Sequence, residues 1–300
     1  MYYFYGKRAD MAIEKMITEE AKKNAIDLLI TMTVDELSEE MNLKPTELLP
    51  RFLLSRTGKL LYKESSKLWW SGPSDIAEMF RKEINGICYV VGAGENYGFH
   101  FKPEKEDYVI AADAGLRYLE ERGTRADLIV GDFDTLHYVP DRGNVLKLPA
   151  EKDDTDMFMA VKEGIKAGYA VFHIYCGTGG RIDHTIANLQ MLAYLAENRM
   201  QGYLFHRDCV LTMIKDGELV FDAAASGYVS VFSHSEKSTG VYLRNLKYEL
   251  HDATLTSSFP LGVSNEFIGK ESRISVESGT LLICFPKDIT LPYLHTKYAR

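Results

Sequence analysis

Ile129-Val130-Gly131-Asp132-Phe133-Asp134-Thr135 is the stretch of sequence that decides both the fold and the expected chemistry. The run that leads into it, 126–130, is short and apolar and contains β-branched residues, which predicts a buried strand. Gly131 ends that strand and allows the backbone to pass close to another part of the molecule. Ligands of open α/β sheets bind at the carboxyl ends of strands, so Asp132 and Asp134 are expected at a ligand site.

Two acids one residue apart also suggest a cation. Asp132 and Asp134 repel each other unless positive charge lies nearby. Mg²⁺ is the natural candidate, because it takes hard oxygen ligands and shares them with substrate phosphates. A turn that carries two solvated acids is the alternative, and the motif alone does not decide between them.

Composition limits the class of protein. The chain has 300 residues, of which 46% are hydrophobic and 26% charged, so two or three soluble domains are expected. The net charge of -8 argues against a general nucleic-acid binder, yet it permits a nucleotide whose charge Mg²⁺ neutralises. No signal-peptide pattern and no membrane-spanning apolar run are present, which predicts a cytoplasmic protein that does not enter a membrane. The cysteines are widely separated and form no CxxC pair, which predicts buried free thiols and no zinc site: Cys88, Cys176, Cys209 and Cys284.

Residues 1–84 are expected to form a helical domain. Apolar residues at helical spacing predict one face of a first helix: Ile13, Ile17, Ala21, Ala25 and Leu28. Thr33 and Glu36 form a capping box that would start a second helix, and Pro45 would open a third. Ser74 would cap a last helix through Phe80.

This helical order leaves a helix-turn-helix open as an alternative. Pro50 falls inside the would-be recognition helix, which argues against DNA binding, whereas residues 44–67 are locally basic, which favours it. Trp69 and Trp70 are expected to pack a turn or an interface. The role of the segment is not predicted.

Strands and helices alternate over residues 86–205. Apolar runs predict strands at 87–91, 108–112, 126–130, 144–148 and 170–175, with helices after the second, fourth and fifth. This alternation predicts a mainly parallel sheet covered on both faces. The last of these strands leads into residues 177–184, where three glycines and a helix N-terminus predict an anion-binding loop. Arg181 offers a forked donor that matches phosphate oxygens. His184 is expected to have a structural role in preference to that of a proton carrier.

Residues 206–300 are expected to form a small β-sandwich domain. Short apolar runs separated by turn signals predict strands at 210–214, 218–221, 228–232, 241–243, 273–276 and 280–285. Between them, residues 262–267 have the sequence GVSNEF. We interpret this polar segment as a loop, either a plain turn or one that recognises the edge of a heterocycle.

Four ordered motifs resemble those of the thiamine pyrophosphokinase family: GDFDT at 131–135, KDDTD at 152–156, GGRIDH at 179–184 and SNEF at 264–267. The resemblance covers about residues 87–287. It implies a Rossmann-like α/β catalytic domain followed by a β-sandwich domain, with the helical segment outside it. It also implies a homodimer that uses ATP and Mg²⁺ to convert thiamine to thiamine diphosphate, with AMP as the second product.

The same resemblance assigns residues to roles. Asp113, Asp132, Asp134 and Asp156 would be catalytic and surround the triphosphate, the last three as metal ligands. Residues that would bind ATP and shape the phosphate loop are Lys152, Asp153, Thr155, Gly179, Gly180, Arg181, Asp183 and His184. Ser264, Asn265 and Glu266 would bind thiamine. The β domain has no tryptophan to stack on thiamine, which leaves Phe267 or a tyrosine of a partner chain.

Two other functions remain open at this point. GDFDTL superficially matches the DxDxT pattern of a Mg²⁺-dependent phosphatase, although Leu136 departs from that pattern. A thiamine-sensing regulator with a helical DNA- or partner-binding domain is the second alternative. The intact acids of all four motifs argue against a retired enzyme.

Overall fold

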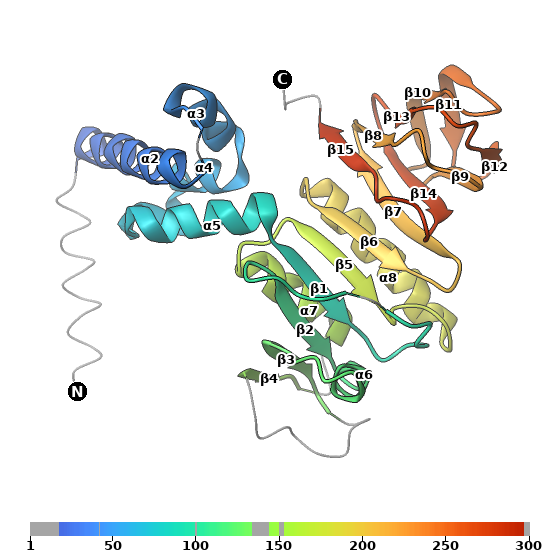
Figure 1. The fold of residues 1–300 in the computed structure, drawn as a ribbon, viewed down its shortest axis with the longest axis horizontal. Coiled ribbons are helices and arrows are strands. Elements are labelled where there is room, and N and C mark those ends of the chain that lie inside the picture. The colour runs from blue at the N-terminus through green and yellow to red at the C-terminus, as the bar shows by residue number, and fades with distance from the viewer. Residues whose placement is uncertain (1–17, 42, 100, 134–143, 150–152, 297–300) are drawn as a thin grey trace. The chain divides into compact units, whose positions relative to one another are not determined.

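The computed structural model describes residues 18–41, 43–99, 101–133, 144–149 and 153–296 (Figure 1). The chain divides into two compact units, a helical unit of residues 1–81 and a sheet unit of residues 82–300. Predictions that concern Ile13, Ile17, Asp134, Thr135 and Lys152 lie outside the described residues.

The helical unit has its own core. It contains α2 (Glu19–Met41), α3 (Pro45–Leu54), α4 (Arg56–Leu61), two short 3-10 turns and most of α5 (Pro73–Asn85). Large apolar side chains from all four helices meet in one buried cluster that includes Leu37, Phe52, Leu61 and Phe80. Trp69 joins this cluster and Trp70 stacks on it at a centroid distance of 4.5 Å, which agrees with a packing role.

Three expectations for this unit are wrong. α2 is one continuous helix, and Thr33 does not cap a second one, because its buried hydroxyl donates to the carbonyl oxygen of Pro73 (3.3 Å). Leu28 is 61% exposed, so the buried face of α2 is rotated about the helix axis by about one residue from the predicted face. That face consists of Ile26, Ile30, Val34 and Leu37. Ser74 lies inside α5, which begins at Pro73, and its hydroxyl donates to Glu36.

The sheet unit is built on one ten-stranded sheet with the order β12-β9-β14-β7-β6-β5-β1-β2-β3-β4. Six strands are parallel: β1 (Ile87–Val91), β2 (Tyr108–Ala112), β3 (Leu128–Gly131), β4 (Asn144–Lys147), β5 (Val171–Tyr175) and β6 (Gln201–Phe205). Four are antiparallel: β7 (Cys209–Lys215), β9 (Tyr228–Ser233), β12 (Gly262–Glu266) and β14 (Thr280–Pro286). Residue 205, where we expected one domain to end, lies inside this continuous sheet.

Helices cover both faces of the parallel part, as the alternation of strands and helices predicts. α7 (Asp156–Lys166) and α8 (Ile182–Glu197) pack on one face, where Cys88 and Val90 of β1 are buried. α6 (Gly115–Glu121) packs on the other face, against Tyr89 and Val91. β1, β2 and β3 are buried on both faces, which explains their nearly continuous apolar sequences.

The antiparallel part shares a second core with a five-stranded sheet of order β11-β10-β13-β8-β15. Its strands are β8 (Gly217–Phe221), β10 (Lys237–Arg244), β11 (Leu250–Thr256), β13 (Ser272–Ser275) and β15 (Tyr293–Thr296). β6, β11, β12 and β15 were not predicted. The expectation that residues 262–267 form a loop is wrong, because 262–266 pair with β9 as an edge strand.

We expect that a chain beginning at Asn85 folds and keeps its activity. The sheet unit has its own apolar cores, and every predicted catalytic residue lies within it. Circular dichroism and cooperative thermal unfolding of the shortened chain would measure the first outcome and turnover the second. Insoluble or inactive protein would show that the helical unit completes the enzyme.

Candidate active site

A pocket of about 980 Å³ opens at the carboxyl ends of β1, β2, β3 and β5. The strand order reverses between β1 and β5, since the chain adds β2, β3 and β4 on one side of β1 and β5 and β6 on the other. Crevices at such a reversal are the usual ligand sites of open α/β sheets. The N-termini of α7 and α8 also line this pocket and add partial positive charge.

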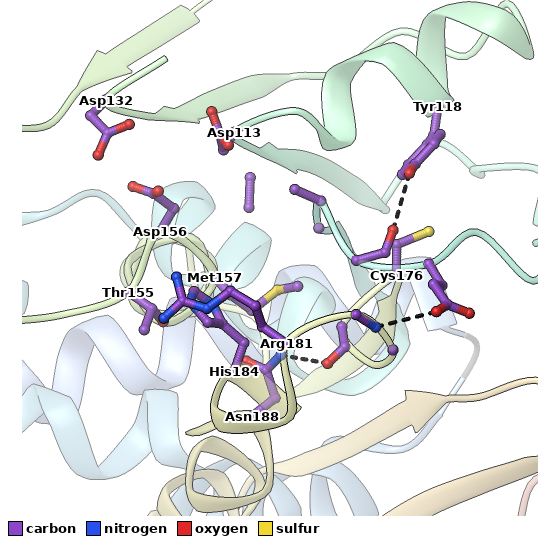
Figure 2. Close-up of a pocket in the computed structure, with 18 of the residues that line it drawn as sticks. Asp113, Tyr118, Asp132, Thr155, Asp156, Met157, Cys176, Arg181, His184 and Asn188 are labelled. Atoms are coloured by element: carbon purple, nitrogen blue, oxygen red, sulfur yellow. Dashed lines mark hydrogen bonds between the residues drawn. The ribbon is translucent and has the colours of Figure 1, made fainter. Parts of the chain in front are cut away.

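Three of the predicted catalytic acids lie together in the pocket. Asp113 follows β2, Asp132 follows β3, and Asp156 is the first residue of α7. Figure 2 shows their carboxylates on one side of the pocket, with Arg181 and His184 on the other side. Oxygen Oδ1 of Asp113 is buried and has no hydrogen-bond partner among the described residues. A buried carboxylate oxygen of this kind requires a cation or another donor in the functional state.

Gly131 brings two of these acids close together. The Asp113 amide donates to the carbonyl oxygen of Val130 (2.8 Å), which ties the end of β2 to β3. A Cβ at Gly131 would lie 3.1 Å from the Asp113 Cα atom, so only glycine fits without displacement. This contact is the close approach that the sequence predicts for Gly131.

The chain leaves three of the parallel strands through left-handed residues that are not glycine. Asp113 (φ 48°), Phe133 (φ 64°) and Cys176 (φ 52°) follow β2, β3 and β5. Such conformations cost energy and persist where the surrounding structure requires them. Phe133 is 3% exposed and packs in the core beside α6, which anchors the segment that carries Asp132. Burial raises the pKa of the Cys176 thiol to about 12, so this residue is neutral and is not a nucleophile.

The donor set fits Mg²⁺ better than a transition metal. No three His, Cys, Asp or Glu side chains of the described residues are close enough to hold an ion by themselves, and Asp134 is outside those residues. Mg²⁺ takes only one or two protein carboxylates and completes its shell with water and phosphate oxygens. Asp113, Asp132 and Asp156 supply oxygen ligands of the required kind around the buried Asp113 oxygen.

Two glycine-containing loops form the opposite wall by pairing with each other. The Gly94 amide donates to the Cys176 carbonyl oxygen (2.7 Å), and the Glu95 amide donates to that of Thr178 (2.9 Å). A Cβ at Gly94 would lie 2.6 Å from the Cys176 oxygen, which makes glycine necessary there. The Gly180 amide in turn donates to the Glu95 carboxylate (3.2 Å).

Charged side chains surround the second loop. The Glu95 pKa is lowered by its hydrogen bond with Tyr97 and then by that with Gly180. Arg181 donates two hydrogen bonds to Asp183, at 3.2 and 2.5 Å, and this contact lowers the pKa of Asp183 and raises that of Arg181. The guanidinium is 73% exposed, so it can turn toward a phosphate. His184 is exposed and lines the pocket, where a bound anion could reach it.

The remaining residues of KDDTD have separate surroundings. The Thr155 hydroxyl accepts a hydrogen bond from the Phe158 amide (3.2 Å) and caps α7. Asp154 forms an ion pair with Lys162 (2.6 Å) and lines the pocket, whereas Asp153 is exposed. Thr155 therefore positions Asp156 by starting the helix, and it also lines the pocket.

The predicted thiamine-binding residues do not line this pocket. Ser264, Asn265 and Glu266 lie on β12, at the opposite edge of the ten-stranded sheet. Asn265 is 3% exposed, and its amide group bonds to Tyr248 and Glu266, so direct contact of this side chain with a ligand is not supported. Ser264 is exposed and left-handed (φ 57°), and its amide donates to the Ser230 hydroxyl (3.1 Å).

Sequence reasoning missed several pocket residues: Glu95, Tyr118, Asp154 and Asn188. Glu95 directly follows the glycines after β1, so the rule that ligands bind at carboxyl ends of strands could have found it. Tyr118 donates to the Gly94 carbonyl oxygen (3.1 Å) and Asn188 to that of Gly177 (2.6 Å). Both contacts join residues of different elements, and no sequence spacing predicts them.

Acids that face a glycine-containing loop and a helix N-terminus in an α/β pocket are typical of sites that bind a polyphosphate with its cation. The family models of the thiamin pyrophosphokinase catalytic domain and vitamin B1 binding domain match residues 101–204 and 218–281. Thiamine pyrophosphokinase from Bacillus subtilis (strain 168) is 27% identical over 181 residues, which cover 58% of this chain and 85% of the relative. The chain belongs to the thiamine pyrophosphokinase family.

Solved structures agree with this assignment. Thiamin pyrophosphokinase from Geobacillus thermodenitrificans is 28% identical, with a TM-score of 0.59, and the match covers 67% of this chain and 98% of that one. The Bacillus subtilis structure shares the fold at 24% identity, with a TM-score of 0.60, over 68% of this chain and all of that chain (100%). The two family models begin after residue 100, so neither includes the helical unit.

Gly131→Ala should destabilise the protein and lower its activity. The added methyl group would press on Asp113 and should cost about 1–3 kcal/mol of unfolding free energy, the usual result of overpacking. Turnover should fall further, because Asp113 would shift from its place in the pocket. Urea unfolding and a turnover assay measure the two effects. Gly72→Ala is the matched control, since its Cβ would meet nothing closer than 3.5 Å, and equal behaviour of the two variants would contradict the expectation.

Proposed function

We propose that this chain is a thiamine diphosphokinase, which transfers the diphosphoryl group of ATP to the hydroxyl group of thiamine and releases AMP. The observation that carries the proposal is the placement of Asp113, Asp132 and Asp156 opposite the glycine loop in one pocket. The family assignment supports thiamine and ATP as substrates and supports neither a DxD-type phosphatase nor a thiamine-sensing regulator.

In this proposal the pocket works mainly by positioning and charge. The thiamine hydroxyl must attack the β-phosphorus of ATP in line with the departing AMP oxygen. Amide groups of Gly177 and Gly179 and the N-terminus of α8 bind phosphate oxygens, and Arg181 exchanges Asp183 for a phosphate. Asp113, Asp132 and Asp156, together with Asp134, would hold Mg²⁺, and the bound ion would supply positive charge for the phosphate oxygens.

The width of the sheet supports a site in which the thiamine is bound by a partner subunit. β12, which carries Ser264, is six strands away from β1. At about 4.8 Å per strand, the two are separated by about 29 Å. Thiamine bound at Ser264 cannot then reach the triphosphate pocket of the same protomer. We therefore propose a homodimer in which the β12 region of one subunit faces the pocket of the other.

Exposed apolar side chains support such a contact. Ile182 (72% exposed) and Ile186 (53%) lie on the first turns of α8, beside the pocket. Tyr228 (68%) and Val263 (45%) flank Ser264 at the other edge of the sheet. Large exposed apolar groups gathered at two such places are typical of surfaces that a partner covers, and a two-fold axis would bring each place against the other.

We infer the finer features of the fold and location in the same way. The parallel part is Rossmann-like, which the strand order and the helices on both faces support, and the two antiparallel layers form a β-sandwich. All four cysteines are free, which supports a reducing compartment such as the cytoplasm. None of the described helices is long and apolar enough to cross a membrane.

Asp132→Asn should lower turnover by ~10²-fold or more while the protein stays folded. The substitution keeps the shape of the side chain and removes one negative charge. In the proposal that charge binds the metal ion against the triphosphate. Production of AMP and thiamine diphosphate, followed by phosphorus NMR, measures the effect, and extra Mg²⁺ should restore part of the activity. Glu197→Gln is the control, because this exposed residue ends α8, about 14 Å along the helix from Asn188, the last residue of α8 that lines the pocket. Near-normal turnover of Asp132→Asn would disprove the metal assignment.

Mixing two inactive variants should restore activity if the site is shared between subunits. Asp132→Asn damages the phosphate pocket, and Ser264→Arg places a positive charge where cationic thiamine is expected. A mixed dimer keeps one intact site, so refolding equal amounts together should recover about a quarter of the wild-type activity. Both substitutions in one chain, mixed with wild type, serve as the control. No recovery in the mixture would show that each protomer builds its site alone.

A further inference from the structure

A carboxylate of this chain lies on the glycine-containing loop that follows β5. The Glu95 carboxylate accepts a hydrogen bond from the Gly180 amide (3.2 Å), and both residues line the pocket. A Cβ at Gly179 would lie 2.7 Å from the Cγ and Cδ atoms of Glu95, so this side chain lies directly against the loop. Backbone N–H groups beside a helix N-terminus attract anions. Glu95 therefore takes a position that a phosphate oxygen could take.

The Glu95 side chain is charged and is free to leave the loop. Its hydrogen bond with Tyr97, and then that with Gly180, lower the pKa of the carboxyl, which keeps the group ionised at neutral pH. The side chain is 50% exposed, so its departure from the loop opens no packed core. An exposed carboxylate on an anion-binding amide can be replaced by an anion of higher charge, because both compete for the same donor.

A second partner for this carboxylate lies on the hairpin between β6 and β7. Nη2 of Arg207 is 3.9 Å from Oε2 of Glu95, which is too long for a hydrogen bond. A displacement of about 1 Å would turn this contact into a charge-assisted hydrogen bond of the usual length. Glu95 thus has two positions within reach, one on the Gly180 amide and one on the Arg207 guanidinium.

Contacts between the hairpin and the loop fix the place of Arg207. His206 Nδ1 and the buried Thr178 hydroxyl share a hydrogen bond (2.9 Å). The Tyr97 ring packs edge-on against His206, with centroids 4.8 Å apart, and its centre lies 5.0 Å from the Arg207 guanidinium. Because these contacts join the hairpin to the loop, Glu95 can change partners while the loop keeps its shape.

The next donor of the loop is covered in the same way. Arg181 donates hydrogen bonds to Asp183 at 3.2 and 2.5 Å, and in the proposed function it exchanges this acid for a phosphate. With Glu95 on the Gly180 amide, acids of the chain itself occupy both donors. A ligand must replace them with a group of higher charge, which favours a polyphosphate over a singly charged anion.

We propose that Glu95 is an internal competitor of the phosphate chain, which leaves the Gly180 amide for Arg207 when a polyphosphate binds. The inference rests on the proposed function, because it assumes that the loop binds the phosphates of ATP. It makes Glu95 a residue that sets the affinity for the nucleotide. The pocket retains a phosphate chain only when that chain displaces the carboxylate, and the return of the carboxylate favours release of the product.

Glu95→Gln tests the competition directly, because it keeps an acceptor for the Gly180 amide and removes the charge. Calorimetric titration with inorganic triphosphate and Mg²⁺ should show about fivefold tighter binding than to wild type, the upper end for one exposed ion pair. The KM for ATP should fall as well, whereas the KM for thiamine should not change. Glu236→Gln is the matched control, since it removes an exposed acid between β9 and β10, outside the pocket.

Arg207→Gln tests the second position of the carboxylate. Without Arg207, Glu95 has no charged partner to move to, so the variant should bind triphosphate more weakly than wild type. In the Glu95→Gln background the same change should have no effect, because the competing charge is already absent. An equal loss in both backgrounds would show that Arg207 binds the phosphate itself, and it would overturn the proposed exchange.

Unchanged or weaker triphosphate binding by Glu95→Gln would also overturn the proposal, since Glu95 would then support the loop or contact the nucleotide. Glu95→Ala gives a second measure, because it frees the Gly180 amide and should bind triphosphate at least as tightly as Glu95→Gln. If wild type forms thiamine diphosphate but these changes are missing, only the inference fails. If wild type neither binds triphosphate nor forms the product, the proposed function fails, and the two failures are thereby distinguished.

Discussion

The close backbone contact between Gly131 and Asp113 is the constraint on which the rest of the site depends. It brings the ends of β2 and β3 together, so the acids that follow these strands share one small volume. One Asp113 oxygen is buried without a hydrogen-bond donor among the described residues, so it needs a cation or a donor nearby. The fold therefore leaves negative charge uncompensated in the pocket, at the place where a triphosphate and its cation would bind. The left-handed conformations of Asp113 and Phe133 are the local energetic cost of this arrangement.

The second constraint is that the parallel strands and the antiparallel strands belong to one continuous sheet. β6 pairs with the antiparallel β7 through Tyr203 and Thr212, so the two functional regions belong to one rigid sheet. Neighbouring strands are held at a fixed spacing, so the strands between β12 and β1 keep Ser264 far from the phosphate pocket. This separation within one protomer supports the proposed dimer, in which two protomers share a site. Flexibility of a single loop would not bridge that distance.

The sequence predicted the parallel part best, because there the local and the tertiary signals agree. β1 and β2 have the expected bounds, and each predicted catalytic acid that the structure describes lies directly after its strand or at the start of its helix. The errors have tertiary causes. Thr33 matches a capping pattern, yet packing against Pro73 keeps it inside α2. β12 has no simple alternation, because its register shifts between Gly262 and Asn265 and Ser264 is left-handed. No local pattern reveals that the side-chain amide of Asn265 forms hydrogen bonds with the backbone of Tyr248.

Several motif residues act on the chain and not on a ligand. The Thr155 hydroxyl accepts a hydrogen bond at the start of α7. Asp183 accepts hydrogen bonds from Arg181, and the Asn265 side chain donates one to the backbone of Tyr248. In the first two cases the neighbour, Asp156 or Arg181, lines the pocket. This division explains why the motifs are compact, since a positioning group must lie within hydrogen-bond reach of what it orients. It also explains why short motifs identify the chemistry well but assign individual roles poorly. A motif specifies an arrangement, and only the hydrogen bonds show which member supports it and which member acts.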